Sequence, residues 1–183
     1  MKLRPTKDAL YFIVISILVA MASQFYYDYK YIPQTSREVK VYYNKETQAN
    51  LHLISAIEHA EQYIYFAIYT FTRTDIKDAL LAAKYRGLEV KGIVDQEQTA
   101  KIPEQNKIVS ELRSVGIPIY HQNHTAIMHL KTLVTDQSYV SGSYNWTTSA
   151  TDFNDEVIQV GRDPDIKKQY ERILKSMFQK YQY

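Results

Sequence analysis

The chain has 183 residues, of which 45% are apolar, so it can form one domain with a hydrophobic core but not two large domains. It contains no cysteine, which excludes disulfide bonds, thiolate metal sites and cysteine nucleophiles. The formal net charge is only +2, so overall charge gives no support to nucleic-acid binding.

The N-terminus has the pattern of a secretory signal peptide. Lys2, Arg4 and Lys7 precede an apolar run over residues 9–22, which a single serine interrupts and which ends in Ala-Met-Ala. The run is short for a membrane-spanning helix, which needs about 20 apolar residues. We therefore predict that residues 1–22 are a signal peptide and that the protein is exported, either to the periplasm or as a secreted protein. The alternatives are an uncleaved membrane anchor formed by residues 9–22 and a buried N-terminal helix.

This targeting segment also carries the excess positive charge. Residues 1–22 hold three of the 22 basic residues and one of the 20 acidic residues. The rest of the chain therefore has 19 of each, and nucleic-acid binding has to rest on a local patch. Lys84, Arg86 and Lys91 are candidates for such a patch, although a solvated helix end is the more ordinary interpretation.

Residues 23–37 are polar and rich in tyrosine, with one proline, and we predict that they form a linker or surface arm. The tyrosines of this arm are suited to stacking on bases or to contact with a membrane surface. We expect the folded domain to cover residues 38–183.

Within that domain, short β-type runs alternate with helical stretches. The predicted strands are residues 39–43, 63–71, 88–95, 117–121, 127–134, 138–142 and 156–160. The predicted helices are residues 48–61, 75–86, 104–114 and 165–180. This alternation is typical of an α/β fold. We expect a layered α/β/α sandwich with a mixed, largely parallel central sheet.

His129 and Lys131 are the first residues that indicate chemistry. They are two residues apart in a predicted strand, so their side chains project from one face, about 7 Å apart. Histidine near neutral pH can attack phosphorus or donate a proton, and an ammonium group beside it stabilises negative charge. The pair indicates a site that acts on a phosphate group.

Three polar residues downstream can complete such a site. Ser143 and Asn145 follow an apolar strand, at the entry to a helical segment predicted to begin near Trp146. A hydroxyl, an amide and free backbone N–H groups there would form a phosphate cradle. Glu156 adds a carboxylate that can orient an imidazole and stabilise its charged form.

The spacing of these residues resembles a known signature. His-x-Lys-x4-Asp over residues 129–136, followed by Gly-Ser-x-Asn over residues 142–145, looks like the HKD motif of the phospholipase D superfamily. The upstream segment AIEHAEQYIYFAIYTFTRTDIKDALLAAKYRGLEVKGIVD is similar to the single-motif, Nuc-type bacterial endonucleases and to their mitochondrial cardiolipin-hydrolase relatives. The resemblance covers about residues 38–180 and implies a phospholipase D-like fold, which makes residues 38–183 a catalytic domain.

The resemblance implies a role for each polar residue of the site. His129 would be the nucleophile that forms a phosphohistidine intermediate. Lys131 and Asn145 would bind the phosphate, Ser143 would assist from the same loop, and Glu156 would hold the imidazole. Neither a metal ion nor a cofactor is expected.

Two further motif positions would be structural. Asp136 would bond to nearby backbone or hydroxyl groups, and Gly142 would shape the loop before the serine. Five residues separate the two, where the usual pattern has six, which predicts a shortened hairpin between the strands.

A single motif also has a consequence for assembly. The mechanism needs one histidine as nucleophile and another to protonate the leaving oxygen, and the chain has only one HKD motif. Single-motif members of the family form a symmetric homodimer, which would bring both copies of His129 into one composite active site. We expect the same homodimer here.

Two substrates fit this chemistry. The first expectation is a non-specific endonuclease acting on DNA or RNA. The alternative is a phospholipase D-type hydrolase of phospholipid headgroups, brought to a membrane through the N-terminus. A non-enzymatic binding module with the same fold is a third hypothesis, which the intact catalytic set argues against.

The remaining histidines have ordinary interpretations. His121 and His124 precede the motif in a loop, and His124 is a candidate for substrate contact. His52 and His59 lie seven residues apart in a predicted helix and are expected to be surface or core-edge residues. Tyrosines at strand spacing are expected to pack in the core or to lie at an interface: Tyr63, Tyr65 and Tyr69.

Overall fold

The computed structural model of the protein describes residues 7–31 and 37–182. The chain divides into two compact units, residues 1–36 and 37–183, and each is described by itself.

The first unit contains one long helix, α1 (Lys7–Tyr31). The helix does not end before residue 23, where the predicted arm begins, but continues to Tyr31 because no proline or glycine interrupts it before Pro33. The remainder of the predicted arm, residues 32–36, lies outside the described residues. Across the described ranges, no helix has both the length and the apolar character required to span a bilayer. The signal peptide and the alternative anchor stay predictions.

The second unit is built on one seven-stranded sheet with the order β1-β7-β6-β5-β2-β3-β4. The strands are β1 (Val39–Tyr43), β2 (Tyr63–Ile68), β3 (Glu89–Val94), β4 (Ile119–His121), β5 (Lys131–Thr135), β6 (Tyr139–Gly142) and β7 (Val157–Gly161). The helices are α2 (Ala49–Glu58), α3 (Thr74–Tyr85), α4 (Gln96–Lys101), α5 (Pro103–Ser114), α6 (Thr148–Asp152) and α7 (Pro164–Lys180).

The sheet is mixed, as predicted, but the expectation that it is largely parallel is wrong. Only β2–β3 and β3–β4 pair in parallel, and the other four pairs are antiparallel. The parallel pairs are those joined by crossover helices, α3 in one case and α4 with α5 in the other. β5 and β6 are joined instead by a tight connection of three residues, 136–138, which is the short hairpin that the motif spacing predicted.

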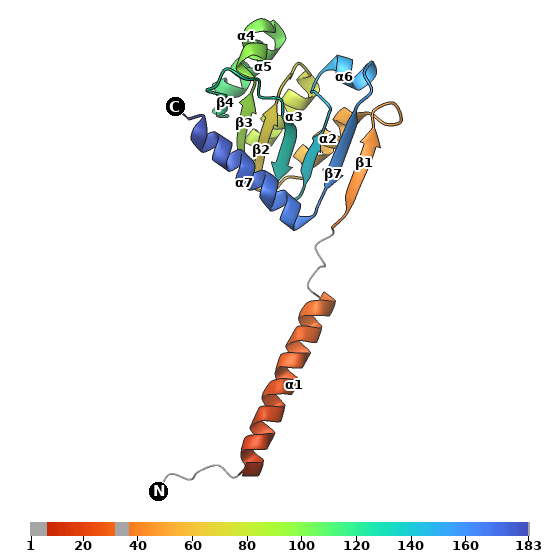
Figure 1. Cartoon of the computed structure of the whole chain (residues 1–183), viewed down its shortest axis with the longest axis vertical. Coiled ribbons are helices and arrows are strands. Elements are labelled where there is room, and N and C mark those ends of the chain that lie inside the picture. The colour runs from red at the N-terminus through yellow and green to blue at the C-terminus, as the bar shows by residue number, and fades with distance from the viewer. Residues whose placement is uncertain (1–6, 32–36, 183) are drawn as a thin grey trace. The chain divides into compact units, whose positions relative to one another are not determined.

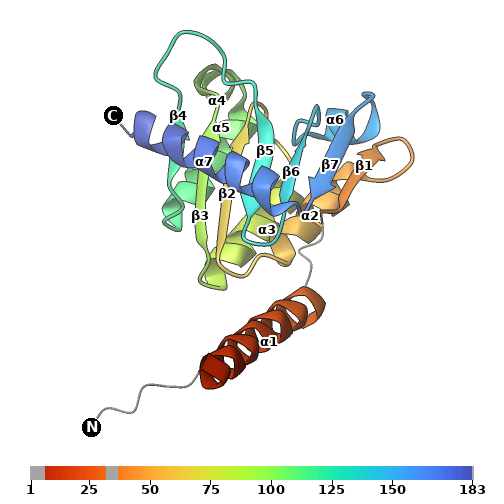
Figure 2. The same cartoon turned by 60° about the horizontal axis from the view of Figure 1, so that its bottom comes forward.

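Helices cover both faces of the sheet, which confirms the α/β/α layering (Figures 1 and 2). One face packs against α2, α3 and α5 in a core that contains Leu53, Leu80 and Leu112. The other face packs against α7, whose Leu174 and Phe178 lie in a second core with Tyr65. The long amphipathic helix α7 crosses this face obliquely (Figure 2).

The strand directions bring many chain ends to one end of the sheet. β1, β2, β3, β4 and β6 all end there, and β5 and β7 begin there. We call this region the carboxyl end of the sheet; it is the upper end of the domain in Figure 1. Segments far apart in the sequence therefore meet at this end, and the candidate site is built from them.

Candidate active site

His129 and Lys131 lie together at the carboxyl end of the sheet. The strand that was predicted over residues 127–134 begins only at Lys131, which pairs with Ile68 of β2, and His129 precedes it. The Tyr69 amide donates to the Leu130 carbonyl at 2.9 Å, which keeps this segment aligned with β2. The His129 side chain is exposed, and the Lys131 Nζ donates to the His129 carbonyl at 3.0 Å.

Tyr69 contacts both His129 and Lys131 and is an addition to the predicted site. Its ring meets the His129 ring edge-on, with centroids 4.6 Å apart, and the Lys131 ammonium lies 5.1 Å from its centroid. Its hydroxyl accepts a hydrogen bond from Gln98 Nε2 at 2.9 Å. Strand spacing grouped Tyr69 with Tyr63 and Tyr65, but those two stack on each other and Tyr65 packs against α7.

Ser143 and Glu156 form the second half of the site. The Ser143 hydroxyl donates to Glu156 Oε2 and accepts from the Val157 amide at 3.2 Å. Glu156 Oε1 accepts from Asn154 Nδ2 at 3.1 Å, and the glutamate is only 8% exposed. Its carboxylate is thus held by Ser143 and Asn154, and no hydrogen bond joins it to His129 within the described residues. The implied contact between Glu156 and the imidazole stays a prediction.

Asn145 connects this half to the segment that follows β2. Its Oδ1 accepts from the Thr70 amide at 3.2 Å, and the next residue, Trp146, forms a parallel β-bridge with Phe71. The helical segment predicted to begin near Trp146 begins instead at residue 148 and is only five residues long. The β-bridge takes the place of the first helical turn, so strand pairing fixes the backbone of Trp146, directly after Asn145.

Asn44, at the end of β1, holds Glu156 in place and was not identified from the sequence. Its Oδ1 accepts from the Glu156 amide at 2.9 Å, and its own amide N–H donates to the Glu156 carbonyl at 3.1 Å. Its Nδ2 donates to the carbonyls of Ala150 and Asn154 at 2.9 and 2.8 Å. More than 100 residues separate Asn44 from these partners, so no local pattern could have revealed it.

We expect Asn44→Ala to lower the free energy of unfolding by about 2 kcal/mol, because it leaves buried backbone groups without partners. Urea denaturation measures this change. Asn123→Ala is the matched control, since Asn123 is exposed and its side chain donates to the exposed Lys180 carbonyl, and a surface change of this kind costs about 0.5 kcal/mol or less. Equal losses in the two variants would contradict the assigned role.

Lys131 and Glu156, which belong to different halves of the site, interact electrostatically. Burial lowers the pKa of Lys131 below its usual value, and the nearby charge of Glu156 opposes that shift. Within the described part of the chain, Lys131 has no carboxylate at ion-pair distance. A half-buried ammonium group without an acidic partner is suited to binding an anion.

A pH dependence follows from the lowered pKa of Lys131. Inorganic phosphate binds the ammonium form, so its affinity is full below the folded-state pKa and falls as pH rises through it. That fall is expected at a pH below lysine's ordinary 10.5. Arginine stays charged over this range, so Lys131→Arg is expected to remove the alkaline fall. The inhibition or dissociation constant of phosphate, measured against pH, checks this, and a wild-type affinity that is constant up to the ordinary lysine pKa would refute it.

Asp136 and Gly142 lie at opposite ends of the hairpin. Asp136 follows β5 at the far end of the sheet, where its Oδ1 accepts from the amides of Glu61 and Gln62 at 3.0 and 3.1 Å. Gly142 closes β6 at the carboxyl end, and a Cβ there would collide with the Val157 carbonyl oxygen. Glycine lets β7 approach closely, just before Ser143 begins the loop.

The other histidines have their own partners. His52 stacks on Tyr42 with centroids 3.6 Å apart, and His59 Nδ1 lies 2.7 Å from a backbone carbonyl oxygen of its own helix. His121 Nδ1 lies 3.3 Å from the Val94 carbonyl, and His124 contacts Tyr181. Over the described residues, no group of three or more metal-ligating side chains is placed to hold a metal ion.

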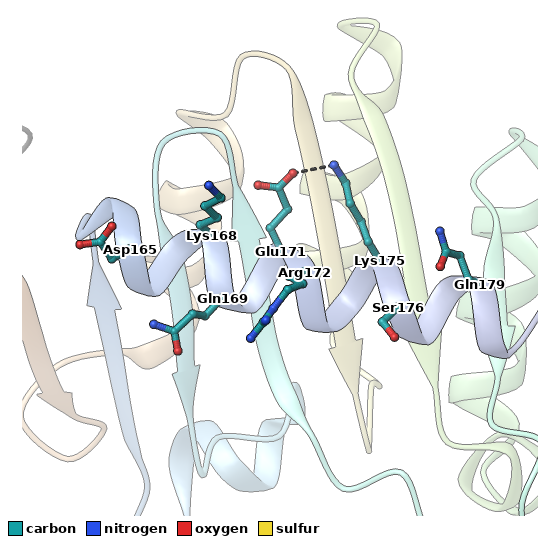
Figure 3. Close-up of a pocket in the computed structure, with 8 residues that line it drawn as sticks. All are labelled: Asp165, Lys168, Gln169, Glu171, Arg172, Lys175, Ser176 and Gln179. Atoms are coloured by element: carbon teal, nitrogen blue, oxygen red, sulfur yellow. Dashed lines mark hydrogen bonds and ion pairs between the residues drawn. The ribbon is translucent and has the colours of Figure 1, made fainter.

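Neither the suggested basic patch nor the hollow on α7 adds residues to the candidate site. Arg86 donates to the Ile57 carbonyl and Lys91 pairs with Glu89, so these members of the suggested basic patch are engaged locally. Among the residues that the structure describes, those that line a hollow along the outer face of α7 all belong to that helix and include the ion pair of Glu171 and Lys175 (Figure 3). None of the HKD-like residues lines it.

Comparisons with known proteins show the family of the chain. The sequence matches the family model "Cardiolipin synthase, PLD-like domain" over residues 53–178, which include both halves of the site. It is 31% identical over 130 residues to the mitochondrial cardiolipin hydrolase of Xenopus tropicalis, covering 70% of this chain and 60% of that protein. It is 26% identical over 141 residues to the phospholipase D of Rickettsia typhi, covering 76% and 68%. The chain spans about half to three fifths of the length of the first curated relatives that it matches.

The fold has equally clear relatives among solved structures. The crystal structure of Nuc from Salmonella typhimurium, a phospholipase D family member, superposes with a TM-score of 0.73 at 28% identity, over 78% of this chain and 95% of that chain. NucT from Helicobacter pylori, with a TM-score of 0.67 and 24% identity over 78% and 98% of the two chains, shares the fold. The chain belongs to the PLD-like domain family, and hence to the phospholipase D superfamily.

Proposed function

We propose that the chain is a metal-independent phosphodiesterase in which His129 attacks phosphorus. The observation that carries this proposal is the exposed His129 beside the half-buried Lys131, which has no acidic partner among the described residues. Lys131 and Asn145 would hold the phosphate oxygens, and Ser143 would assist from the loop after β6. Glu156 is buried and accepts a hydrogen bond from the Ser143 hydroxyl. Its negative charge would help to keep Lys131 in the ammonium form.

The reaction would proceed in two displacements. A ring nitrogen of His129 forms a bond to phosphorus while the bond from phosphorus to the leaving oxygen breaks, and a second histidine donates a proton to that oxygen. The oxygen of a water molecule then forms a bond to phosphorus while the bond from phosphorus to the His129 nitrogen breaks, which releases the phosphate product and His129, and the second histidine accepts the proton that the water loses. We propose that the second histidine is His129 of another copy in a symmetric homodimer.

The favoured substrate is nucleic acid, cut as by a non-specific endonuclease. The support is the likeness to Nuc, which extends over 95% of that chain, and the similarity to Nuc-type endonucleases in the segment before the motif. Phospholipid is the second candidate, supported by the relatives named cardiolipin hydrolase and phospholipase D. Two apolar side chains that flank His129, Ile127 and Leu130, are exposed, which suits an approach to lipid.

The full chain, assayed in EDTA on DNA, RNA and phospholipid vesicles, separates these proposals. Cleavage of nucleic acid that survives EDTA and weakens with salt supports the endonuclease. Release of phosphatidic acid with no cutting of nucleic acid supports the lipid hydrolase. Loss of all activity in EDTA would refute the metal-free mechanism.

Export also remains a proposal, motivated by the charged and apolar pattern of residues 1–22. N-terminal sequencing of the protein from its native compartment distinguishes cleavage after Ala22 from an uncleaved anchor. A protein that is found uncleaved and unattached to membrane would contradict both.

A further inference from the structure

A fully buried carboxylate lies close to the site without a part in the proposed chemistry. Asp95 directly follows β3, and its exposed fraction is 0%. Its Oδ1 accepts from the Gln98 amide at 2.8 Å and caps α4. Its Oδ2 accepts from Gln122 Nε2 at 2.7 Å and from the Met128 amide at 2.9 Å. A buried carboxylate needs such donors, so these three bonds fix the segments that supply them.

The bond to Met128 reaches the backbone beside His129. Residues 123–127 are exposed, whereas Met128 is only 3% exposed, so Asp95 holds the point where this loop returns to the domain. On the other side of His129, the Leu130 carbonyl accepts from the Tyr69 amide. His129 is therefore exposed but held by an anchor on each flanking residue.

A second route from Asp95 reaches the ring of His129. The Asp95 carboxylate caps the helix that carries Gln98. The Gln98 side chain donates to the Tyr69 hydroxyl at 2.9 Å and accepts from the Thr70 hydroxyl at 3.2 Å. The Tyr69 ring in turn packs edge-on against His129.

We propose that Asp95 is a positioning residue for His129, which it holds through the Met128 amide and through Gln98 and Tyr69. The inference rests on the proposed nucleophilic role of His129. A nucleophile has to be held in line with the phosphorus atom, and a displacement of about 1 Å costs on the order of 100-fold in rate.

Asp95→Ser tests this role. Serine caps a helix about as well as aspartate, so α4 keeps its start, while the Met128 amide and Gln122 lose their acceptor. We expect kcat to fall by about 100-fold with little change in KM, because the phosphate-binding groups are untouched. In addition, the His129 imidazole signals in NMR spectra should shift and broaden.

Asp163→Ser is the matched control. Asp163 is also a mostly buried N-cap, which accepts from the amides of Asp165 and Ile166. It begins α7 and lies about 25 Å along that helix from the end that contacts the loop over 122–128. Asp163→Ser should keep its helix cap, kcat and the His129 signals.

The outcomes separate this inference from the proposed function. Wild-type kcat in a folded Asp95→Ser variant, or an equal loss in both variants, overturns the positioning role alone. If the wild-type chain cleaves no phosphodiester, the proposed function fails, and the His129 signals still decide whether Asp95 positions that side chain. Should Asp95→Ser not fold, Gln98→Leu tests the second route, and unchanged His129 signals in that variant overturn the inference.

Discussion

His129→Asn is expected to reduce phosphodiesterase turnover by at least about 1,000-fold, because it removes the attacking nitrogen together with the group that transfers protons. The change should leave the fold intact, since the His129 side chain is exposed and Asp95 and Tyr69 hold the backbone on either side. Turnover and the thermal unfolding midpoint, measured on the same preparation, check both statements.

The matched control for this variant is His59→Asn. His59 is also exposed, but it is the C-cap of α2, where its side chain contacts Ser55, so its replacement should leave turnover unchanged. Comparable losses in the two variants would show that the assay does not report on the site.

His129→Asn also tests whether the active site is shared between two copies of the chain. In an equal, randomly exchanged mixture of wild type and His129→Asn, about a quarter of the dimers carry two intact histidines. A composite site would therefore give about one quarter of wild-type activity, whereas independent sites would give about one half. An activity of one half would refute the composite homodimer while leaving the nucleophile in place.

Glu156→Gln is expected to lower kcat/KM by about 100-fold and to move the alkaline limb of its pH profile to lower pH. The charge of Glu156 raises the pKa of Lys131 against the effect of burial. Without that charge, the pKa of Lys131 falls further, and the ammonium group that binds phosphate is lost at a lower pH. Steady-state kinetics over the alkaline range measure both effects.

Glu171→Gln serves as the control for this prediction. Glu171 is a partly buried glutamate that also accepts from a hydroxyl, that of Tyr63, and pairs with Lys175. It lies on α7, away from the site, and its replacement should leave the alkaline limb in place. If Glu156→Gln loses activity without moving that limb, Glu156 does not act through Lys131.

The sequence was informative where the chemistry is local. The motif from His129 to Glu156 is compact because one hairpin and one short loop bring its members, except Asp136, to the same end of the sheet. The α/β/α layering also followed from the alternation of strand and helix patterns. The individual catalytic roles of the motif residues stay predictions, which the variants above test.

Sequence patterns were less informative where partners lie far apart along the chain. Asn44 reaches Glu156 across 112 residues, and Asp95 reaches Met128 across 33. Single polar residues such as these follow no sequence periodicity, so their hydrogen-bond partners become visible only when the order of the strands in the sheet is known. The direction of strand pairing was hidden for the same reason, because alternating hydrophobicity does not state which neighbour a strand will find.

The C-terminal position of α7 has a consequence for synthesis of the protein. This helix covers the face of the sheet that holds Met128, and near its end the Lys180 carbonyl accepts from Asn123 while Tyr181 contacts His124. These groups follow every residue of the motif in the chain. A nascent chain therefore carries the whole motif before the loop beside the nucleophile has its cover, and we expect the site to become ordered only after α7 has been synthesised and has packed against the sheet.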